Sequence, residues 1–471
     1  MNPNYEELKS LLATTLSELV KTQAELVKTQ AKFKKALERI DELEKQINKN
    51  SKNSSKPPST DQKKNTEDKL RKKRGYRAGK ARELYPEERV DNKVICCSEA
   101  CPHCNSADLL ERDEAPHVLQ QAELPQTSAI ITQYERLKYQ CKACQKRFIA
   151  ALPNGIANSS FGPSVLALLA TLTGRFHLAK REALQLIESL YKLKISEGSV
   201  INVEEVVSQA LKDPYERIHR FVMQKVLPKH FDETVWRNNG KRQYAWIATT
   251  KSAAFYRIDP RRSRAAFERL IGKARSFPYV TDRYSAYKAL DGPHQYCLAH
   301  LARNFLHFVD DKDRDATIAT GIATIFKCIC KTYSHYKKLE MSKHAYGQRI
   351  RRMKSKLEDL LLDGCANGKK KFSTLCETLC DEFEHLFVFQ KIEEVEPTNN
   401  LAERDLRKLV IWRKKSYGTR SDKGKSFVAV ITSISETLKK SKRNILEFLT
   451  KAISAFFAGT PAPFIEESLG F

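Results

Sequence analysis

The stretch from Val226 to Asn238, VLPKHFDETVWRN, is rich in apolar and β-favouring residues. It ends at Asn238-Asn239-Gly240, a combination that favours a tight hairpin turn. Two further β-favouring runs follow, Tyr244–Thr250 (YAWIATT) and Ala253–Ile258 (AAFYRI). The spacing of these runs predicts an antiparallel meander with Asp232 in its opening strand.

A second aspartate follows the next apolar run. Phe277–Thr281 (FPYVT) ends directly at Asp282, and the segment before it, Arg264–Ile271, has the periodicity of a crossover helix. Open α/β sheets bind their ligands at the carboxyl ends of their strands. We therefore expect Asp282 at such a strand end, in the same sheet as Asp232.

A third acidic residue lies in Thr398–Arg407 (TNNLAERDLR), where the pattern predicts the start of a helix. Pro397 disfavours helix upstream, and the Thr398 hydroxyl can accept from first-turn N–H groups. Residues three or four apart share a helix face. The shared face contains Asn399, Asn400, Glu403 and Arg407. Carboxylate, amide and guanidinium groups together suit a hard cation and a phosphodiester, whereas an exposed Glu403–Arg407 ion pair is the simpler alternative.

Four segments follow one another in a specific order: FDETVWR (Phe231–Arg237), DRYSAY (Asp282–Tyr287), CLAHLAR (Cys297–Arg303) and TNNLAERDLR (Thr398–Arg407). Together they resemble the successive motifs of insertion-sequence-66 family DDE transposases. The resemblance implies a ribonuclease-H-like α/β catalytic domain in which Asp232, Asp282 and Glu403 bind Mg²⁺ (or Mn²⁺). We assign DNA-binding or auxiliary roles to Asn399, Asn400, Arg404, Arg407, Arg237, His300 and Arg303.

The residue types indicate the chemistry of this site. Three converging carboxylates repel one another, which raises their pKa values until cations neutralise them. Two Mg²⁺ ions roughly 4 Å apart can hold a scissile phosphate, activate water or a 3′-hydroxyl, and stabilise the leaving oxygen. Strand cleavage and strand transfer then need no covalent intermediate. Tyr284 and Tyr287 are accordingly interpreted as packing or DNA-contacting residues, with packing favoured.

The interval between Asp282 and Glu403 is too long for one ordinary connection. Ile318–Leu339 and Tyr346–Leu362 are long, rich in Lys and Arg and free of Pro, which predicts an inserted helical subdomain. The cysteines of this region are interpreted as reduced core residues; they are Cys328, Cys330, Cys365, Cys376 and Cys380.

The net charge is +26, with 83 Lys and Arg against 57 Asp and Glu. Such an excess indicates a polyanionic partner, here double-stranded DNA, rather than a merely soluble basic protein. Beyond Glu403, the basic stretches Trp412–Lys415 and Lys423–Lys425 are expected to follow the DNA backbone.

The amino-terminal segment has a heptad pattern. Its seam consists of Leu12, Leu19, Leu26, Phe33, Ile40 and Ile47. The other core position is weak, because Thr15, Thr22 and Thr29 occupy it. A coiled coil that joins copies of the chain is favoured over a helix folded back on its own core. The following Ser/Asn/Lys/Pro-rich linker cannot build a core.

Two C-x2-C knuckles, Cys101–Cys104 and Cys141–Cys144, have the spacing of a tetrahedral zinc site. Ser128–Tyr139 is expected to form a hairpin or strand before the second knuckle. The ligands predicted for Zn²⁺ are Cys101, Cys104, Cys141 and Cys144, with Cys96, Cys97 and His103 as substitutes. Disulfide pairing is the alternative, and a reducing compartment disfavours it. The resemblance also implies a zinc-binding region at this place in the chain.

Helices are predicted at Leu166–Thr173, Lys180–Tyr191 and Ser196–Leu211, with Ser196 as a cap. They suit either a DNA-reading helix-turn-helix or scaffold packing. No signal peptide or membrane span is evident, so a cytoplasmic, nucleoid-associated bacterial protein is expected.

We interpret the chain as a multidomain α+β DNA transposase of a bacterial insertion sequence, acting on element ends and target as a homodimer or higher oligomer. Helper proteins are further possible partners. The alternatives are a noncatalytic, repurposed DNA-binding protein and a structure-selective nuclease. The expected domains are a heptad helix (5–48), a basic linker (49–90), a zinc-binding module (91–155), a helical helix-turn-helix-like domain (160–222), the catalytic domain in two parts (223–310 and 393–455), a helical insertion (311–392) and a C-terminal tail (456–471).

Overall fold

The computed structural model describes residues 5–47, 84–225, 227–309, 314–463 and 465. The chain divides into two compact units. One consists of Met1–Gln62, Gln133–Leu186 and Lys194–Phe471, and the other of Lys63–Thr132 and Ile187–Leu193. Most of the predicted basic linker lies outside the described residues. Within the described ranges, no helix combines the length and apolar character needed to cross a membrane.

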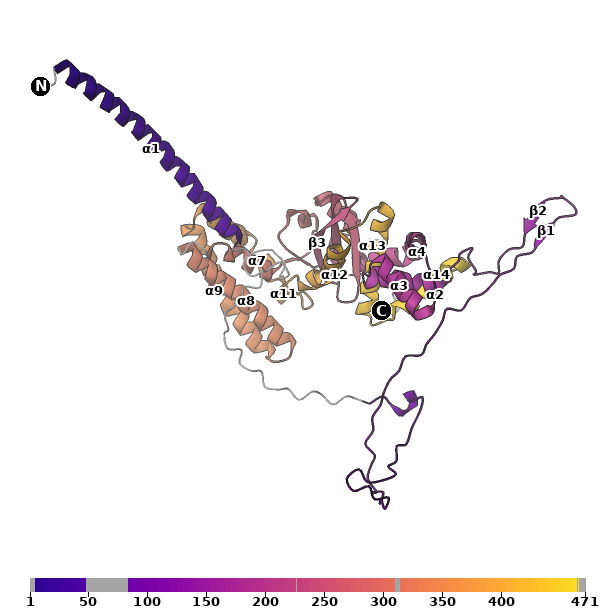
Figure 1. Ribbon diagram of the computed structural model, residues 1–471. Coiled ribbons are helices and arrows are strands. Elements are labelled where there is room, and N and C mark those ends of the chain that lie inside the picture. Colours follow the sequence, from indigo (N-terminus) through magenta and orange to yellow (C-terminus); the bar gives the residue numbers. More distant parts are fainter. Residues whose placement is uncertain (1–4, 48–83, 226, 310–313, 464, 466–471) are drawn as a thin grey trace. The chain divides into compact units, whose positions relative to one another are not determined.

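A mixed five-stranded sheet forms the centre of the larger unit (Figure 1). Its strands are β3 (Lys229–Asn238), β4 (Lys241–Thr249), β5 (Ala254–Asp259), β6 (Tyr279–Thr281) and β7 (His294–Tyr296), in the order β5-β4-β3-β6-β7. The predicted meander is confirmed, because β3, β4 and β5 pair antiparallel. Asn239 and Gly240 have φ values of 48° and 73° at its first turn, as a tight hairpin requires.

The two faces of the sheet are covered by different helices. Alternate residues of a strand point to opposite faces. Phe231 of β3 contacts Phe267 of α6 (Arg264–Ile271), whereas Trp236 contacts Trp412 of α12 (Asn400–Ser416). Asp232 has the same parity as Trp236. Its side chain therefore belongs to the face covered by α12, the helix that contains Glu403.

A third helix, α13 (Asp422–Lys440), covers the outer edge of β5. The Thr437 hydroxyl accepts from the Ala254 N–H at 3.1 Å, and the Ser433 hydroxyl accepts from the Tyr256 N–H at 2.9 Å. An open edge strand would expose these N–H groups to pairing with another chain. The hydroxyl groups of α13 remove that hazard.

Helices α8 (Arg314–Lys337), α9 (Lys343–Asn367) and α10 (Lys370–Asp381) lie between the second and third acidic residues, and α8 and α9 run side by side (Figure 1). Helices were predicted for this interval, and they are present. The short elements η6 (Phe383–Leu386) and α11 (Val388–Lys391) lead back to the sheet. These helices share one apolar core with α7 (Leu298–Leu306) and with residues of β6 and β7, so the insertion is continuous with the sheet.

The cysteines of this insertion differ from one another in burial. Cys376 is buried, and Cys330, Cys365 and Cys380 are partly buried, as expected of core residues. Cys328 is exposed, so the prediction of a core position is wrong there. All five are free thiols.

The segment before the sheet is helical, as predicted. It contains α2 (Pro163–Ala170), the π-helical turn η3 (Thr171–Arg175), α3 (Lys180–Tyr191), α4 (Glu197–Ala210) and α5 (Lys212–Gln224). Ser196 caps α4 by accepting from the Ser199 N–H at 3.3 Å, which confirms its predicted role.

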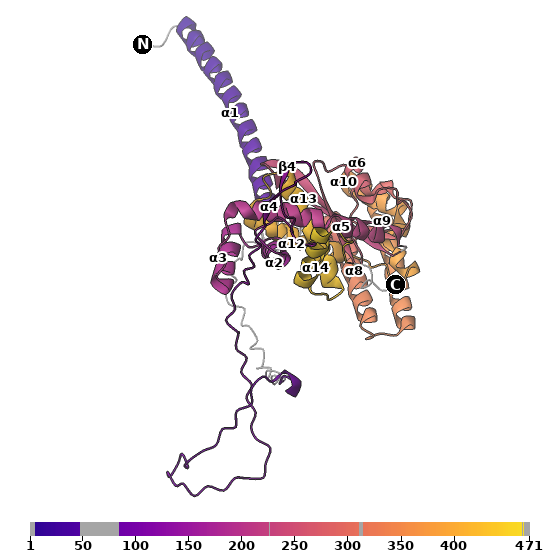
Figure 2. The same cartoon turned by 90° about the vertical axis from the view of Figure 1, so that its right-hand side faces the viewer.

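Most of these helices pack against the C-terminal helices. Helix α2 contacts α14 (Ile445–Ala458), and α4 contacts α13 (Figure 2). The Arg175 guanidinium also pairs with the buried carboxylate of Glu436 on α13. This arrangement supports scaffold packing, the alternative to a DNA-reading role, for α2 and α4.

The amino-terminal helix α1 (Tyr5–Ile47) is continuous over 43 residues. Its seam side chains from Leu12 to Ile40, the part that the structure describes, are largely exposed, from 52% at Ile40 to 65% at Phe33. The hydroxyls of Thr15, Thr22 and Thr29 donate to carbonyls one turn earlier in the same helix. No described residue therefore covers the apolar stripe. The hydroxyl groups of the three threonines have hydrogen-bond partners within α1 itself.

Candidate active site

Two of the predicted acidic residues lie on neighbouring parallel strands. Strand β3 pairs with β6 in a register that aligns Lys229 with Tyr279 and His230 with Val280. If this register continues for two residues, Asp232 comes beside Asp282, which follows β6 directly. Paired strands lie about 4.8 Å apart. The fold thus brings together two carboxylates that are far apart in the sequence.

The third acidic residue is fixed to the same place by Asn399. The Asn399 side chain donates to the Phe231 carbonyl at 2.8 Å and accepts from His230 Nδ1 at 3.1 Å. Both partners are on β3, next to Asp232. The Asn399 carbonyl also accepts from the Glu403 N–H at 3.2 Å, in the first turn of α12. Asn399 therefore sets the start of α12 against the strand that carries Asp232.

The predicted cap of this helix is wrong by one residue. Helix α12 begins at Asn400, and Asn399, not Thr398, is at the N-cap position without making a side-chain cap bond. Because the Asn399 amide bonds to β3 instead, a tertiary contact replaces the local one that Thr398 was expected to make. Asn399 is 1% exposed, which leaves its side chain no access to DNA.

Burial raises the pKa values of both aspartates, and carboxylate repulsion adds to the shift of Asp232. Burial raises the pKa of Asp232 well above its usual range, and the nearby carboxylates of Glu233, Asp282 and Glu403 raise it further. Burial also raises the pKa of Asp282, although the Tyr284 N–H donates to that carboxylate at 2.9 Å and opposes the shift. In the described part of the chain, these three carboxylates do not form a group with all ligand atoms within 4.8 Å.

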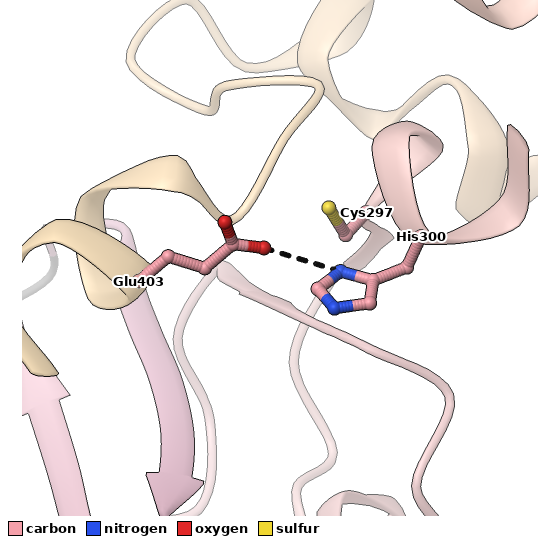
Figure 3. Close-up of side chains that lie close together, drawn as sticks. All are labelled: Cys297, His300 and Glu403. Carbon is pink, nitrogen blue, oxygen red and sulfur yellow. Dashed lines mark ion pairs between the residues drawn. The ribbon is translucent and has the colours of Figure 1, made fainter. Parts of the chain in front are cut away.

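The Glu403 carboxylate is held by α7. Its Oε1 lies 3.2 Å from Arg303 Nη2. The same oxygen lies 3.6 Å from His300 Nδ1 (Figure 3). Burial, with the Arg303 charge nearby, lowers the pKa of His300 to about 4, so the imidazole is neutral at neutral pH. The alternative of a Glu403–Arg407 pair is not observed among the described residues. Arg407 is exposed instead.

A fourth carboxylate near the site, that of Glu233, was not recognised from the sequence. It pairs with Arg262 at 2.6 Å and accepts from the Tyr287 hydroxyl, and burial raises its pKa. Tyr287 is fully buried among aromatic rings, which confirms the expectation of a packing role. The adjacent pair Asp232-Glu233 could have pointed to Glu233. Alternate residues of a strand point to opposite faces, so the sequence places one carboxylate on each face of the sheet at this position.

The remaining predicted site residues fall into two groups. Arg237, Asn400, Arg404 and Arg407 are exposed and free to meet a large ligand. In the basic stretch Trp412–Lys415, Trp412 is buried and Arg413 donates to the Val235 carbonyl on β3. The expectation that this stretch follows DNA is therefore wrong for Trp412 and Arg413, which hold α12 on the sheet.

The two C-x2-C knuckles have the same local fold. In the first, the Cys101 carbonyl accepts from the Asn105 N–H at 2.8 Å; in the second, the Cys141 carbonyl accepts from the Gln145 N–H at 2.9 Å. Asn105 and Gln145 have φ values of 62° and 59°. A short hairpin of β1 (Lys138–Gln140) and β2 (Arg147–Ile149) flanks the second knuckle.

Backbone N–H groups point at the first sulfur of each knuckle. N–H groups of His103 and Cys104 lower the pKa of Cys101, and those of Cys144 and Ala143 lower the pKa of Cys141. A regular strand begins only at Lys138, so the strand expected over Ser128–Tyr139 is mostly irregular chain. The knuckles belong to different units, and the four-cysteine zinc site stays a prediction.

A family model described as "Transposase IS66 family" matches residues 158–426, a range that contains the sheet, the three acidic residues and α7. The chain belongs to the IS66 transposase family. A second model, described as a family of unknown function (DUF6444), matches residues 2–89. No curated protein matches the chain. As an IS66 transposase, it is a DNA-processing enzyme and therefore binds DNA.

Proposed function

We propose that this IS66 transposase uses the two-metal DDE mechanism to cleave and transfer DNA strands at the ends of its own bacterial element. The observation that carries the proposal is the parallel register of β3 and β6, which, continued by two residues, brings Asp232 beside Asp282 just after β6. The Asn399 bond to β3 adds the start of α12, the helix that contains Glu403. The strand order β5-β4-β3-β6-β7, with the first three antiparallel, supports the ribonuclease-H-like fold implied by the resemblance.

The donor set fits Mg²⁺ or Mn²⁺. Asp232, Asp282 and Glu403 supply carboxylate oxygens, the ligands that hard divalent cations prefer. Burial raises the pKa of both aspartates, so their ionised forms are disfavoured until a cation binds beside them. When bound, the metal ions lower the pKa of the attacking hydroxyl or water and stabilise the leaving oxygen.

The chain's own groups position these acids. Asn399 holds the first turn of α12 against β3, and Arg303 holds the Glu403 carboxylate at 3.2 Å. Exposed Arg237, Arg404 and Arg407 are available to contact backbone phosphates, because guanidinium groups bind phosphate oxygens in pairs.

In addition to the exposed arginines, a basic cavity next to the site could bind a phosphate of the DNA. It has a volume of about 460 Å³ and is lined by Lys251, Lys337 and Lys338 together with Thr398 and Asn400 at the start of α12. Lysine side chains and a helix N-terminus both attract phosphate. We assign this cavity to a phosphate of the DNA strand that enters the active site.

The amino-terminal regions are assigned to assembly and folding. The exposed heptad seam of α1 supports self-association into a homodimer or larger oligomer, which transposition needs in order to hold two element ends. Zn²⁺ bound by the four knuckle cysteines would stabilise the module around them. Helper proteins and a cytoplasmic, nucleoid-associated location remain part of the same proposal.

The test uses labelled element ends incubated with the full-length protein and Mg²⁺. Free 3′ ends joined to target DNA are expected for a transposase. Cleavage alone would indicate a structure-selective nuclease, and binding alone a repurposed DNA-binding protein. Asp282→Asn is expected to abolish both cleavage and joining while DNA affinity is retained. Persistent cleavage by this variant would contradict the assignment.

A further inference from the structure

Three side chains with different donor atoms meet at the junction of α7 and α12. Cys297 is the N-cap residue of α7, His300 lies one turn further along, and Glu403 is in the first turn of α12. One ligand atom of each lies within 4.8 Å of the other two (Figure 3). Among the described residues, these three form a group whose ligand atoms are close enough to hold one metal ion.

The imidazole of His300 has a nitrogen with no partner. Its Nδ1 is buried and makes no hydrogen bond, and it faces the Glu403 Oε1 at 3.6 Å. A buried polar atom without a partner normally costs stability. The separation is too long for a hydrogen bond. It is close to the roughly 3.3–3.5 Å expected between two ligand atoms at tetrahedral angles, each about 2.0–2.1 Å from one zinc ion.

The donor set also selects the kind of metal. A thiolate, an imidazole and a carboxylate with one open position suit Zn²⁺ and similar cations, whereas Mg²⁺ prefers oxygen ligands alone. The Asn399 N–H lies 3.2 Å from the Cys297 sulfur and donates to it, which orients the sulfur toward the junction. Cys297 does not belong to the predicted knuckles, and the DDE mechanism has no use for a thiol.

We propose that Cys297, His300 and Glu403 form a second metal site, which binds a thiophilic divalent cation of the zinc class and takes Glu403 away from the catalytic Mg²⁺. Binding forms a sulfur–metal bond as the Cys297 thiol releases its proton to solvent. It also displaces Arg303 from Glu403. The first part stands on the geometry alone, whereas the inhibitory consequence rests on the proposed function.

Glu403 is placed to serve both sites. Its charge raises the pKa of Asp232 on one side and contributes to raising that of Cys297 on the other. A carboxylate bound to zinc beside α7 is not available to complete a magnesium site beside β3. Zinc-class cations would thus act as an inhibitor that competes with Mg²⁺ for one side chain.

The test for the metal site uses Co²⁺ as a spectroscopic substitute for Zn²⁺, added to the full-length protein in excess Mg²⁺. A thiolate ligand gives Co²⁺ an intense near-ultraviolet absorption. The spectrum of Cys297→Ser is subtracted from that of the wild type, so that absorption from the knuckle cysteines cancels. Cys328→Ser, which removes an exposed thiol outside the cluster, is the matched control.

We expect a difference spectrum equivalent to one bound ion for Cys297→Ser, affinity weakened more than tenfold in His300→Gln, and no change in Cys328→Ser. Tryptophan fluorescence verifies that each variant is folded. Equal Co²⁺ titrations of the wild type and both cluster variants would overturn the proposal.

The test of inhibition measures strand cleavage at several Mg²⁺ concentrations with and without micromolar Zn²⁺. Zn²⁺ is expected to raise the Mg²⁺ concentration needed for half-maximal activity in the wild type, and to do so less in Cys297→Ser. Zinc inhibition of equal size in both proteins would refute the inhibitory role. If Mg²⁺ supports no cleavage at all, the proposed function fails, and the Co²⁺ titration still decides whether the metal site exists.

Discussion

Replacement of Asn399 by alanine removes the contact that joins α12 to β3. The variant loses the bond to the Phe231 carbonyl at 2.8 Å and the bond from His230 Nδ1 at 3.1 Å. The residue is 1% exposed, so water does not replace the lost partner. A buried polar group left unpaired costs about 1–3 kcal/mol. Two such groups predict a loss of roughly 2–6 kcal/mol in the free energy of unfolding.

The chain provides a specific probe for this measurement. All three tryptophans lie in or against the catalytic sheet, where Trp236 and Trp246 are fully buried and Trp412 is 9% exposed. Their fluorescence during urea denaturation therefore reports on this domain. The matched control is Asn400→Ala, which changes the exposed neighbouring residue and should stay within about 0.5 kcal/mol of the wild type.

The same variant separates positioning from stability. The activity of Asn399→Ala is measured without urea, under conditions where the variant is folded. Misplacement of Glu403 by about 1 Å is then expected to reduce the rate of strand transfer on the order of 100-fold. DNA affinity should be retained, because the Asn399 side chain has no access to DNA. An Asn399→Ala variant as stable and as active as the wild type would refute the role assigned to Asn399.

Three further predictions follow from single residues. Asp282→Asn should increase the free energy of unfolding of the metal-free protein, because it removes a carboxylate whose pKa is raised by burial and whose charge raises the pKa of Asp232; each pKa unit corresponds to about 1.4 kcal/mol. It should also reduce the further stabilisation that Mg²⁺ gives, and a melting temperature below that of the wild type would contradict this. Gly418→Ala should destabilise the domain by more than about 2 kcal/mol, because φ is +107° and a Cβ would lie 2.1 Å from the Arg237 carbonyl oxygen, whereas the control Gly424→Ala meets no atom nearer than 3.4 Å. Burial lowers the pKa of His230 to about 4, so the unfolded chain binds a proton at this residue before the folded chain does as the pH falls. The free energy of unfolding should therefore decrease between pH 6.5 and 4 by up to about 1.4 kcal/mol per pH unit. Urea titrations at several pH values should show that His230→Gln lacks this part of the decrease.

The parts of the fold that were predicted correctly depend on local signals. The hairpin at Asn239-Gly240 needs positive φ values, which few residues tolerate, and the crossover helix was predicted with its observed bounds, Arg264–Ile271. Both features follow from a few consecutive residues. The position of Asp282 at a strand end follows from the same kind of pattern.

The parts that were missed depend on contacts between distant residues. Helix α13 was interpreted only as a basic stretch at its start, because Ser433 and Thr437 look like ordinary polar residues until β5 is beside them. Thr398 has the side chain of a helix cap, but the helix begins one residue later because the Asn399 side chain bonds to β3. The resemblance indicated auxiliary roles for His300 and Arg303 in the same site as Glu403, but the closeness of Cys297 to both His300 and Glu403 depends on the packing of two helices that are far apart in the sequence.

Helix α7 is only nine residues long, and its two sides have different neighbours. Leu301 and Phe305 belong to the apolar core of the insertion, whereas His300 and Arg303 face Glu403. A short rigid rod cannot shift on one side and stay still on the other. We therefore expect a displacement of the inserted helices to move the residues that contact Glu403, so that the insertion would influence the proposed catalytic site without contacting the scissile bond.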